Sequence, residues 1–285
     1  MTKALILDID GVIVGNKPGY NFPNPHPDVI AALRKIEEHG LPVSLCTAKP
    51  AFSIQSIIDA AGLRNPHISN GGAAIIDPID HRVIAEHTIE KALARHVAQF
   101  ALEHELYVEL YTSDNCYILR KQESELTRKH AGVEQRYPQL IDDVEAFLAA
   151  YDLVKIFFVT KDEPQKRHFN EAFLQAFKDK VTFSWTVHPT LLPCQLGVVT
   201  ALGVSKAHGA LEVAKSTGIE LTDTLGIGDT LHDWQFIELC GYAGAMGNAS
   251  DELKKLVAAK GENSFVGGDV DKNGVLSILS HFKLR

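Results

Sequence analysis

Two aspartates separated by one residue, Asp8 and Asp10, follow a short apolar run near the N-terminus and could do chemistry together. Two carboxylates at this spacing repel each other unless one is protonated or a cation lies between them. A hard divalent cation such as Mg²⁺ would remove this conflict and leave one carboxylate free to act as a nucleophile. The alternative is a solvated turn, in which the aspartates and Gly11 serve only the turn conformation.

Four more residues with chemically useful side chains follow or begin other predicted elements, namely Thr47, Lys206, Asp229 and Asp233. Carboxylates, a hydroxyl and a lysine around one point match what phosphoryl transfer needs, because cations and N–H donors hold the phosphate oxygens. Each residue also has an ordinary structural explanation. Thr47 could bond to the backbone, Lys206 could lie on a solvated helix surface, and Asp233 could favour a helix dipole.

The predicted elements bring these residues to one place. The apolar run at 4–7 ends abruptly at Asp8, which is typical of a buried parallel strand. We expect it to begin a β-α-β-α-β pattern that extends through strands ending near 46, 69 and 76, and that resumes after about residue 199. A parallel sheet collects the carboxyl ends of its strands at one edge, so Asp8, Thr47 and Asp229 should converge there.

The middle of the chain has a different pattern. An amphipathic helix is expected at 90–104, a hairpin at 106–119 and a strong strand at 152–160, and the polar stretch 123–150 should be broken at Gly132 and Pro138. Mixed strands and helices of this kind indicate an inserted α+β module. The predicted fold is therefore α/β, with a Rossmann-like parallel-sheet core at 1–81 and 199–285 and an inserted α+β domain at 82–198.

Composition narrows the classes of function. The chain has 285 residues and a net charge of −8, which argues against a nucleic-acid surface. No apolar run is long enough to span a bilayer, and the chain enters a core strand where a signal peptide would lie, so we expect a cytoplasmic protein without a membrane partner. The four cysteines have no metal-ligand spacing and fit reduced thiols.

Several short motifs follow one another along the whole chain. They are Asp8-Ile9-Asp10-Gly11-Val12, Thr47, Asn70-Gly71-Gly72-Ala73, Gly203-Val204-Ser205-Lys206, Gly228-Asp229-Thr230-Leu231-His232-Asp233, Met246-Gly247-Asn248-Ala249 and Asn273-Gly274-Val275. In this order and spacing they resemble the haloacid-dehalogenase-like (HAD) phosphohydrolases, and within them the Cof-type branch with a large α/β cap, type IIB. The inserted domain would then be that cap.

The resemblance implies roles for the matching acidic residues. Asp8 would attack phosphorus and form an aspartyl-phosphate, while Asp10 would protonate the leaving oxygen and then take a proton from water. Mg²⁺ would be held by the carboxylates of Asp8 and Asp229 and by the backbone carbonyl of Asp10, with Asp233 behind them or acting through water.

Phosphate would be held by Thr47, the amide of Ala48 and Lys206. Two positions depart from the family pattern. His232 stands where the family usually has Asn, and we predict that it also contacts phosphate, since imidazole can donate a hydrogen bond. The second motif continues with Lys49 where the family commonly has Arg, which keeps the charge without the bidentate fork.

The sequence therefore predicts a Mg²⁺-dependent phosphatase that acts on a small phosphorylated metabolite, such as a sugar phosphate, with the cap choosing the substrate. Two alternatives stay open. One is a sugar phosphomutase of the same architecture, and the other is a non-catalytic phosphate-binding protein.

Overall fold

The computed structural model describes residues 2–284, which form two compact units. The first unit contains the residues up to Lys49, Ile54–Ile84 and the residues from Ser205 onward, and the second contains Pro50–Ser53 and Ala85–Val204. The domain boundaries predicted from the sequence, after residues 81 and 198, stay a prediction.

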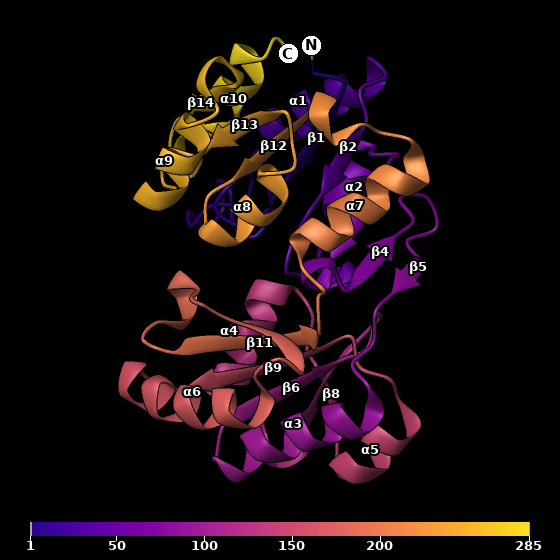
Figure 1. Cartoon of the computed structure of the whole chain (residues 1–285), viewed down its shortest axis with the longest axis vertical. Helices are drawn as coiled ribbons and strands as arrows, with labels where there is room; N and C mark the ends of the chain where they lie inside the picture. The colour runs from indigo at the N-terminus through magenta and orange to yellow at the C-terminus, as the bar shows by residue number, and fades with distance from the viewer. Residues whose placement is uncertain (1, 285) are drawn as a thin grey trace. The chain divides into compact units, whose positions relative to one another are not determined.

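A five-stranded parallel sheet forms the centre of the first unit (Figure 1). Its strand order is β14-β13-β12-β1-β2, and every neighbouring pair is parallel. The strands are β1 (Ala4–Leu7), β2 (Val43–Leu45), β12 (Thr224–Gly228), β13 (Tyr242–Ala245) and β14 (Ser264–Val266). Every residue of β1 is buried, as expected of a central strand with helices on both faces. The predicted parallel α/β core is confirmed.

Helices cover both faces of this sheet. α7 packs against α8 and α8 against α9 on one face, while α1 packs against α2 and α10 (Figure 1). Their bounds are α1 (Pro27–Glu38), α2 (Gln55–Ala61), α7 (Lys206–Thr217), α8 (Leu231–Ile237), α9 (Asp251–Ala258) and α10 (Val275–His281). α7 begins where the Ser205 side chain accepts a hydrogen bond from the His208 N–H and ends at Gly218, whose φ is 74°.

One predicted parallel strand is antiparallel. β3 (His67–Ser69), β4 (Ala74–Ile76) and β5 (Val83–Glu86) form a separate three-stranded sheet, in which β4 runs antiparallel to β3. Between them, Asn70, Gly71 and Gly72 have φ values of 49°, 69° and 100°. These left-handed residues turn the chain back on itself, so β4 cannot continue the parallel pattern.

The second unit contains a six-stranded mixed sheet of order β10-β11-β9-β6-β7-β8. The strands are β6 (Tyr107–Tyr111), β7 (Cys116–Leu119), β8 (Gln139–Ile141), β9 (Lys155–Thr160), β10 (Val181–Thr186) and β11 (Gln195–Ala201). α3 (Lys91–Glu103), α5 (Val144–Ala150) and α6 (Glu163–Phe177) share an apolar core with one face of this sheet (Figure 1). The predicted α+β character of this segment is confirmed.

The predicted helix break at Gly132 is wrong. α4 spans Glu125–Glu134 and includes this glycine in its interior. The helix ends only at Gln135, which has a φ of 57°. Tertiary packing explains this result, because Thr127, His130 and Val133 bury one face of α4 and offset the low helix propensity of a single glycine.

Across residues 2–284, no helix is both long enough and apolar enough to cross a membrane.

Candidate active site

Three neighbouring parallel strands place the predicted site residues at one edge of the first unit's sheet. β1 lies between β12 and β2, and the three strands lead into Asp229, Asp8 and, through Cys46, Thr47. The N–H of Asp8 donates to the carbonyl of Ile227 over 3.0 Å, so the sheet ladder fixes the backbone of Asp8 itself. The expected convergence of these residues therefore follows from the register of the central strands.

Three carboxylates meet at this edge. Oxygens of Asp8, Asp229 and Asp233 lie within 4.8 Å of one another. The close approach depends on Gly11, which has a φ of 76° and on which a Cβ would lie 2.0 Å from Asp229 Oδ2. Any larger residue at this position would push the Asp229 carboxylate out of the cluster.

Lys206, the first residue of α7, joins two of these acids. Its Nζ lies 2.9 Å from Asp8 Oδ2 and 2.6 Å from Asp233 Oδ1, and the Lys206 side chain is only 8% exposed. Burial alone would lower the pKa of Lys206, but the carboxylates of Asp233 and Asp8 outweigh burial and raise it. Lys206 is therefore a buried ammonium, and the interpretation as a solvated surface lysine is wrong.

Asp233 has both carboxylate oxygens engaged. Oδ1 accepts from Lys206, while Oδ2 accepts from the N–H groups of Asp229 (3.0 Å) and Thr230 (2.9 Å) and from the Thr230 hydroxyl (3.1 Å). Burial opposes ionisation of Asp233, but Lys206 and these donors hold its pKa below the usual range. This arrangement supports the predicted position of Asp233 behind the metal rather than on it.

Asp8 and Asp229 carry the unbalanced charge of the cluster. Burial raises the pKa of Asp8 well above its usual range, Lys206 opposes the rise, and the charges of Asp233 and Asp229 add to it. Burial and Asp233 likewise raise the pKa of Asp229 to about 7. Such carboxylates fit Mg²⁺, since a hard cation with oxygen ligands would remove the cost of ionising both together.

The loop after β2 is tied down around Thr47. The Lys49 N–H donates to Thr47 Oγ1 over 3.2 Å, and the carbonyl of Thr47 accepts from the Gly71 N–H over 2.9 Å. Because the Thr47 hydroxyl oxygen accepts from the backbone, its own hydrogen can point to another acceptor, such as a phosphate oxygen. Ala48, the other predicted phosphate contact of this loop, is exposed.

His232 lies in the first turn of α8 and is partly buried. Burial lowers the pKa of His232, and the charge of nearby Lys206 lowers it further. The imidazole is therefore neutral at pH 7 and could donate one hydrogen bond. Its contact with phosphate stays a prediction.

Two contributions to this edge were not predicted from the sequence. The Lys49 ammonium lies 3.5 Å from Asp10 Oδ2, which gives the predicted acid/base a cationic neighbour. Asn248 holds the loop after β1, because its Nδ2 donates to the Gly11 carbonyl (2.9 Å) while its Oδ1 accepts from the Val270 N–H (2.9 Å). The only sequence feature that pointed to Asn248 was the motif that contains it.

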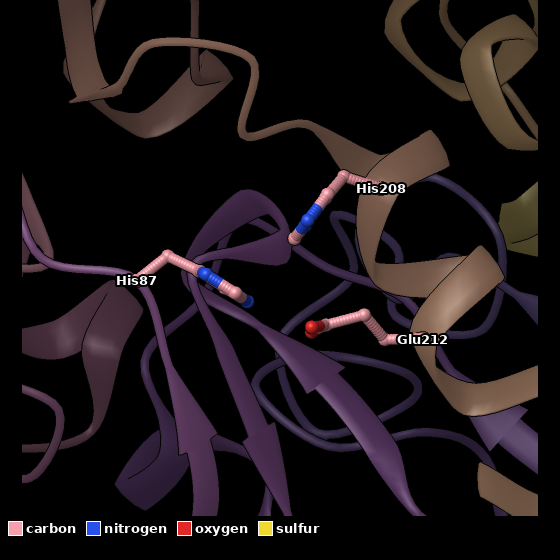
Figure 2. A group of neighbouring side chains, drawn as sticks. All are labelled: His87, His208 and Glu212. Atoms are coloured by element: carbon pink, nitrogen blue, oxygen red, sulfur yellow. The ribbon is translucent and has the colours of Figure 1, made fainter. Parts of the chain in front are cut away.

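A second group of polar side chains lies on α7 in the same unit. His208 and Glu212 are one helical turn apart and extend to the same side of α7 (Figure 2). His87, also drawn in Figure 2, follows β5 and belongs to the second unit. Two donors on α7 fall short of the three or four protein ligands of a typical zinc site.

Comparison with known proteins agrees with this geometry. A model of the haloacid dehalogenase-like hydrolase family matches residues 5–279. Phosphatase YwpJ of Bacillus subtilis is 24% identical, with 98% of this chain and 99% of that protein covered. The 5-amino-6-(5-phospho-D-ribitylamino)uracil phosphatase YwtE of Bacillus subtilis is also 24% identical, with 96% and 95% covered.

A solved structure has the same fold. The HAD subclass IIB sugar phosphatase BT4131 superposes with a TM-score of 0.79 at 20% identity, and the match covers 100% of both chains. At this identity the likeness establishes the fold alone. Because the family model spans nearly all of the sequence, the chain belongs to the haloacid dehalogenase-like hydrolase family.

Proposed function

We propose that this hydrolase is a Mg²⁺-dependent phosphatase that releases phosphate from a small phosphorylated metabolite through an aspartyl-phosphate. One observation carries the proposal, namely the buried cluster in which Lys206 bridges Asp8 and Asp233 beside the carboxylate of Asp229. A nucleophilic carboxylate, a fixed ammonium and further acidic ligands are the groups that phosphoryl transfer uses.

Asp8 is the proposed nucleophile because its carboxylate is held from both sides. Its Oδ1 accepts from the Ile9 N–H over 2.8 Å, and its Oδ2 contacts Lys206. A carboxylate oxygen of Asp8 would attack phosphorus as the bond from phosphorus to the leaving oxygen breaks. Lys206 and the Thr47 hydroxyl would hold the other phosphate oxygens, which gather negative charge during transfer.

Asp10 is the proposed acid and base. It would give a proton to the departing oxygen, so the substrate leaves as an alcohol. The resulting carboxylate would then take a proton from the water that attacks phosphorus of the aspartyl-phosphate, which releases phosphate and restores Asp8. Asp10 is the more accessible of the two acids, with its side chain 37% exposed compared with 10% for Asp8.

Asp8 and Asp229 would hold Mg²⁺, and the backbone carbonyl of Asp10 completes the proposed set of protein ligands. When bound, the cation supplies positive charge that offsets the repulsion between the nucleophile and the phosphate. The raised pKa values of Asp8 and Asp229 support this proposal, because the single ammonium of Lys206, which contacts Asp8 and Asp233, cannot balance three carboxylates.

The proposed substrate class follows the relatives that are named phosphatases, one of which acts on a phosphorylated ribitylamino compound. We therefore place sugar and sugar-alcohol phosphates first in a screen. Purified protein with Mg²⁺ should release inorganic phosphate from at least one such compound. Transfer of the phosphate to another position of the sugar, without release, would indicate a mutase instead.

Asp8→Asn is the decisive variant, because the amide keeps the size of the side chain and removes the nucleophile. We expect turnover to fall by at least about 10⁴-fold, as is typical when a covalent nucleophile is lost. Circular dichroism should confirm that the variant is folded. Near-normal phosphate release by a folded Asp8→Asn protein would show that Asp8 is not the nucleophile. Activity of the native protein that persists in the presence of a chelator would contradict the proposed requirement for Mg²⁺.

A cytoplasmic location is part of the same proposal. Cys46, Cys116, Cys194 and Cys240 are all free thiols, and reduced cysteines persist where glutathione and thioredoxin operate.

A further inference from the structure

A buried lysine pairs with the proposed acid/base. Lys49 Nζ lies 3.5 Å from Asp10 Oδ2, and the Lys49 side chain is 8% exposed while that of Asp10 is 37% exposed. A partly exposed carboxylate in the loop after a strand can adopt several rotamers, and a buried ammonium beside it favours one of them.

The backbone of Lys49 is fixed at both of its polar groups. Its N–H donates to Thr47 Oγ1 over 3.2 Å, and its carbonyl accepts from the Asn70 N–H over 2.8 Å. With the backbone held and the side-chain stem buried, the ammonium has little freedom to leave Asp10. Lys49 is therefore a fixed point against which the Asp10 carboxylate can be oriented.

We propose that Lys49 is a positioning residue, which holds Oδ2 of Asp10 so that the other carboxylate oxygen faces the leaving oxygen of the substrate. The inference rests on the proposed function and deepens it. Asp10 has this salt bridge on Oδ2, and within residues 2–284 its Oδ1 accepts no hydrogen bond. Oδ1 is thus the oxygen through which the proton would pass.

The chemistry predicts where this positioning matters. When the P–O bond breaks, the leaving oxygen keeps the bonding electron pair and takes the proton from Asp10. If the leaving group is stable as an anion, the rate of P–O cleavage depends little on this proton. If the leaving group is a less stable anion, the rate depends strongly on it. A misplacement of about 1 Å in a catalytic group can cost 10²-fold in rate. Loss of Lys49 should therefore penalise poor leaving groups selectively.

Two aryl phosphates of similar shape test this point, p-nitrophenyl phosphate and p-methylphenyl phosphate, since the nitro compound leaves as the more stable anion. For Lys49→Met we expect kcat/KM to fall by on the order of 10- to 100-fold with the methyl compound, and by at least about tenfold less with the nitro compound. Lys49→Arg should recover most of the loss, because it restores a cation beside Asp10.

The matched control is Lys3→Met, which breaks another lysine–aspartate pair of the same unit, that of Lys3 with Asp223 at 2.7 Å. The Lys3 side chain is 73% exposed, and its variant should leave both substrates unaffected. Inhibition by inorganic phosphate gives a further readout. An unchanged inhibition constant in Lys49→Met supports positioning of Asp10, while equal losses on both substrates with weaker phosphate inhibition would place Lys49 on the phosphate and overturn the inference.

A double variant isolates the coupling. If Lys49 acts through Asp10, Lys49→Met should add little to the loss of activity already caused by Asp10→Asn. If the two residues act independently, the fold-losses of the two single variants should multiply in the double variant. Multiplying losses would contradict the inference while leaving Asp8 as the nucleophile. Failure of the proposed function has a different signature, because Asp8→Asn would then retain activity whatever happens at Lys49.

Discussion

Replacement of Lys206 by methionine keeps most of the side-chain volume and removes one buried positive charge. In the structure this charge lies 2.9 Å from Asp8 Oδ2 and 2.6 Å from Asp233 Oδ1, with Asp233 fully buried. Breaking a buried ion pair from one side costs about 3–5 kcal/mol, since the remaining charge is left uncompensated. We therefore expect a large loss of stability together with a loss of activity.

The assay is urea unfolding followed by circular dichroism in metal-free buffer at pH 7. With a slope of about 2 kcal/mol/M, the Lys206→Met midpoint should fall by roughly 1.5–2.5 M. Lys3→Met is the control, because it removes an equal charge from a lysine that is 73% exposed, and its midpoint should scarcely move. Adding Asp233→Asn to Lys206→Met should restore part of the lost stability, since it removes a stranded buried charge.

Equal midpoints for Lys206→Met and Lys3→Met would refute this reasoning, because Lys206 would then not be balancing buried carboxylates. A midpoint that falls further when Asp233→Asn is added would also contradict it. In that case the hydrogen bonds that Asp233 accepts from Asp229 and Thr230 would matter more than its pairing with Lys206.

Three further predictions concern charge and space. The pKa of Asp229 is raised from 3.8 to about 7, so the contribution of Asp229 to folding stability is complete below about pH 4 and is lost as pH rises through 7. The thermal unfolding midpoint in the presence of a chelator should therefore fall from pH 5 to pH 8, and added Mg²⁺ should raise this midpoint most at pH 8. Gly11→Ala places a Cβ 2.0 Å from Asp229 Oδ2, so turnover and the Mg²⁺ dependence of the thermal midpoint should both be lost in a protein that still folds by circular dichroism. His130→Leu removes a buried imidazole 2.8 Å from Glu109, and should cost about 3–5 kcal/mol in urea unfolding. Burial opposes the shift, but Glu109 raises the pKa of His130, so this cost should be largest at pH 6, where His130 is protonated, and should shrink as the pH rises and the imidazole loses its proton.

The acidic cluster was predictable from the sequence because topology alone assembles most of it. Asp8 and Asp229 each follow a strand, and the two strands are parallel neighbours in register. Once the strands are recognised, the only question is whether they pair, and the motifs suggest that they do. Lys206 was identified from the Gly203-Val204-Ser205-Lys206 motif and from its place near the start of a predicted helix, and the structure places it as the first residue of α7.

The pairing of Lys49 with Asp10 could not be predicted in the same way. The two residues lie on different loops, and their contact depends on how far each loop extends beyond its strand. No local pattern records that distance. The turn at Asn70 was a related failure, since its left-handed conformation reverses the chain where apolar residues on both sides suggested another parallel strand.

The inserted segment shows a different limit of prediction. Its strands and helices were recognisable from periodicity, yet Glu109 was not singled out although it is 2% exposed. It accepts hydrogen bonds from Tyr107 (2.9 Å) and Tyr111 (2.5 Å) and pairs with His130, which also stacks on Phe157. A charged residue within a strand sequence normally indicates that its face of the sheet is exposed to solvent. Here a helix covers that face, and this packing is not visible in the strand sequence itself.

The balance of charge is expected to link binding of the proposed metal to binding of the phosphate. Lys206 contacts both Asp8 and Asp233, and three further hydrogen-bond donors stabilise the Asp233 carboxylate, so one positive charge faces three acids and the excess negative charge is least compensated at Asp8 and Asp229. A phosphate dianion brought to this edge adds to the same excess, and Lys206 alone cannot balance both. Bound Mg²⁺ would offset the negative charge of both the acids and the phosphate. Mg²⁺ and phosphate should therefore each strengthen binding of the other by the same factor. Inorganic phosphate should therefore bind measurably more tightly with Mg²⁺ than without it, and Mg²⁺ more tightly with phosphate. Independent affinities in calorimetry would mean that the cation and the phosphate do not share this cluster.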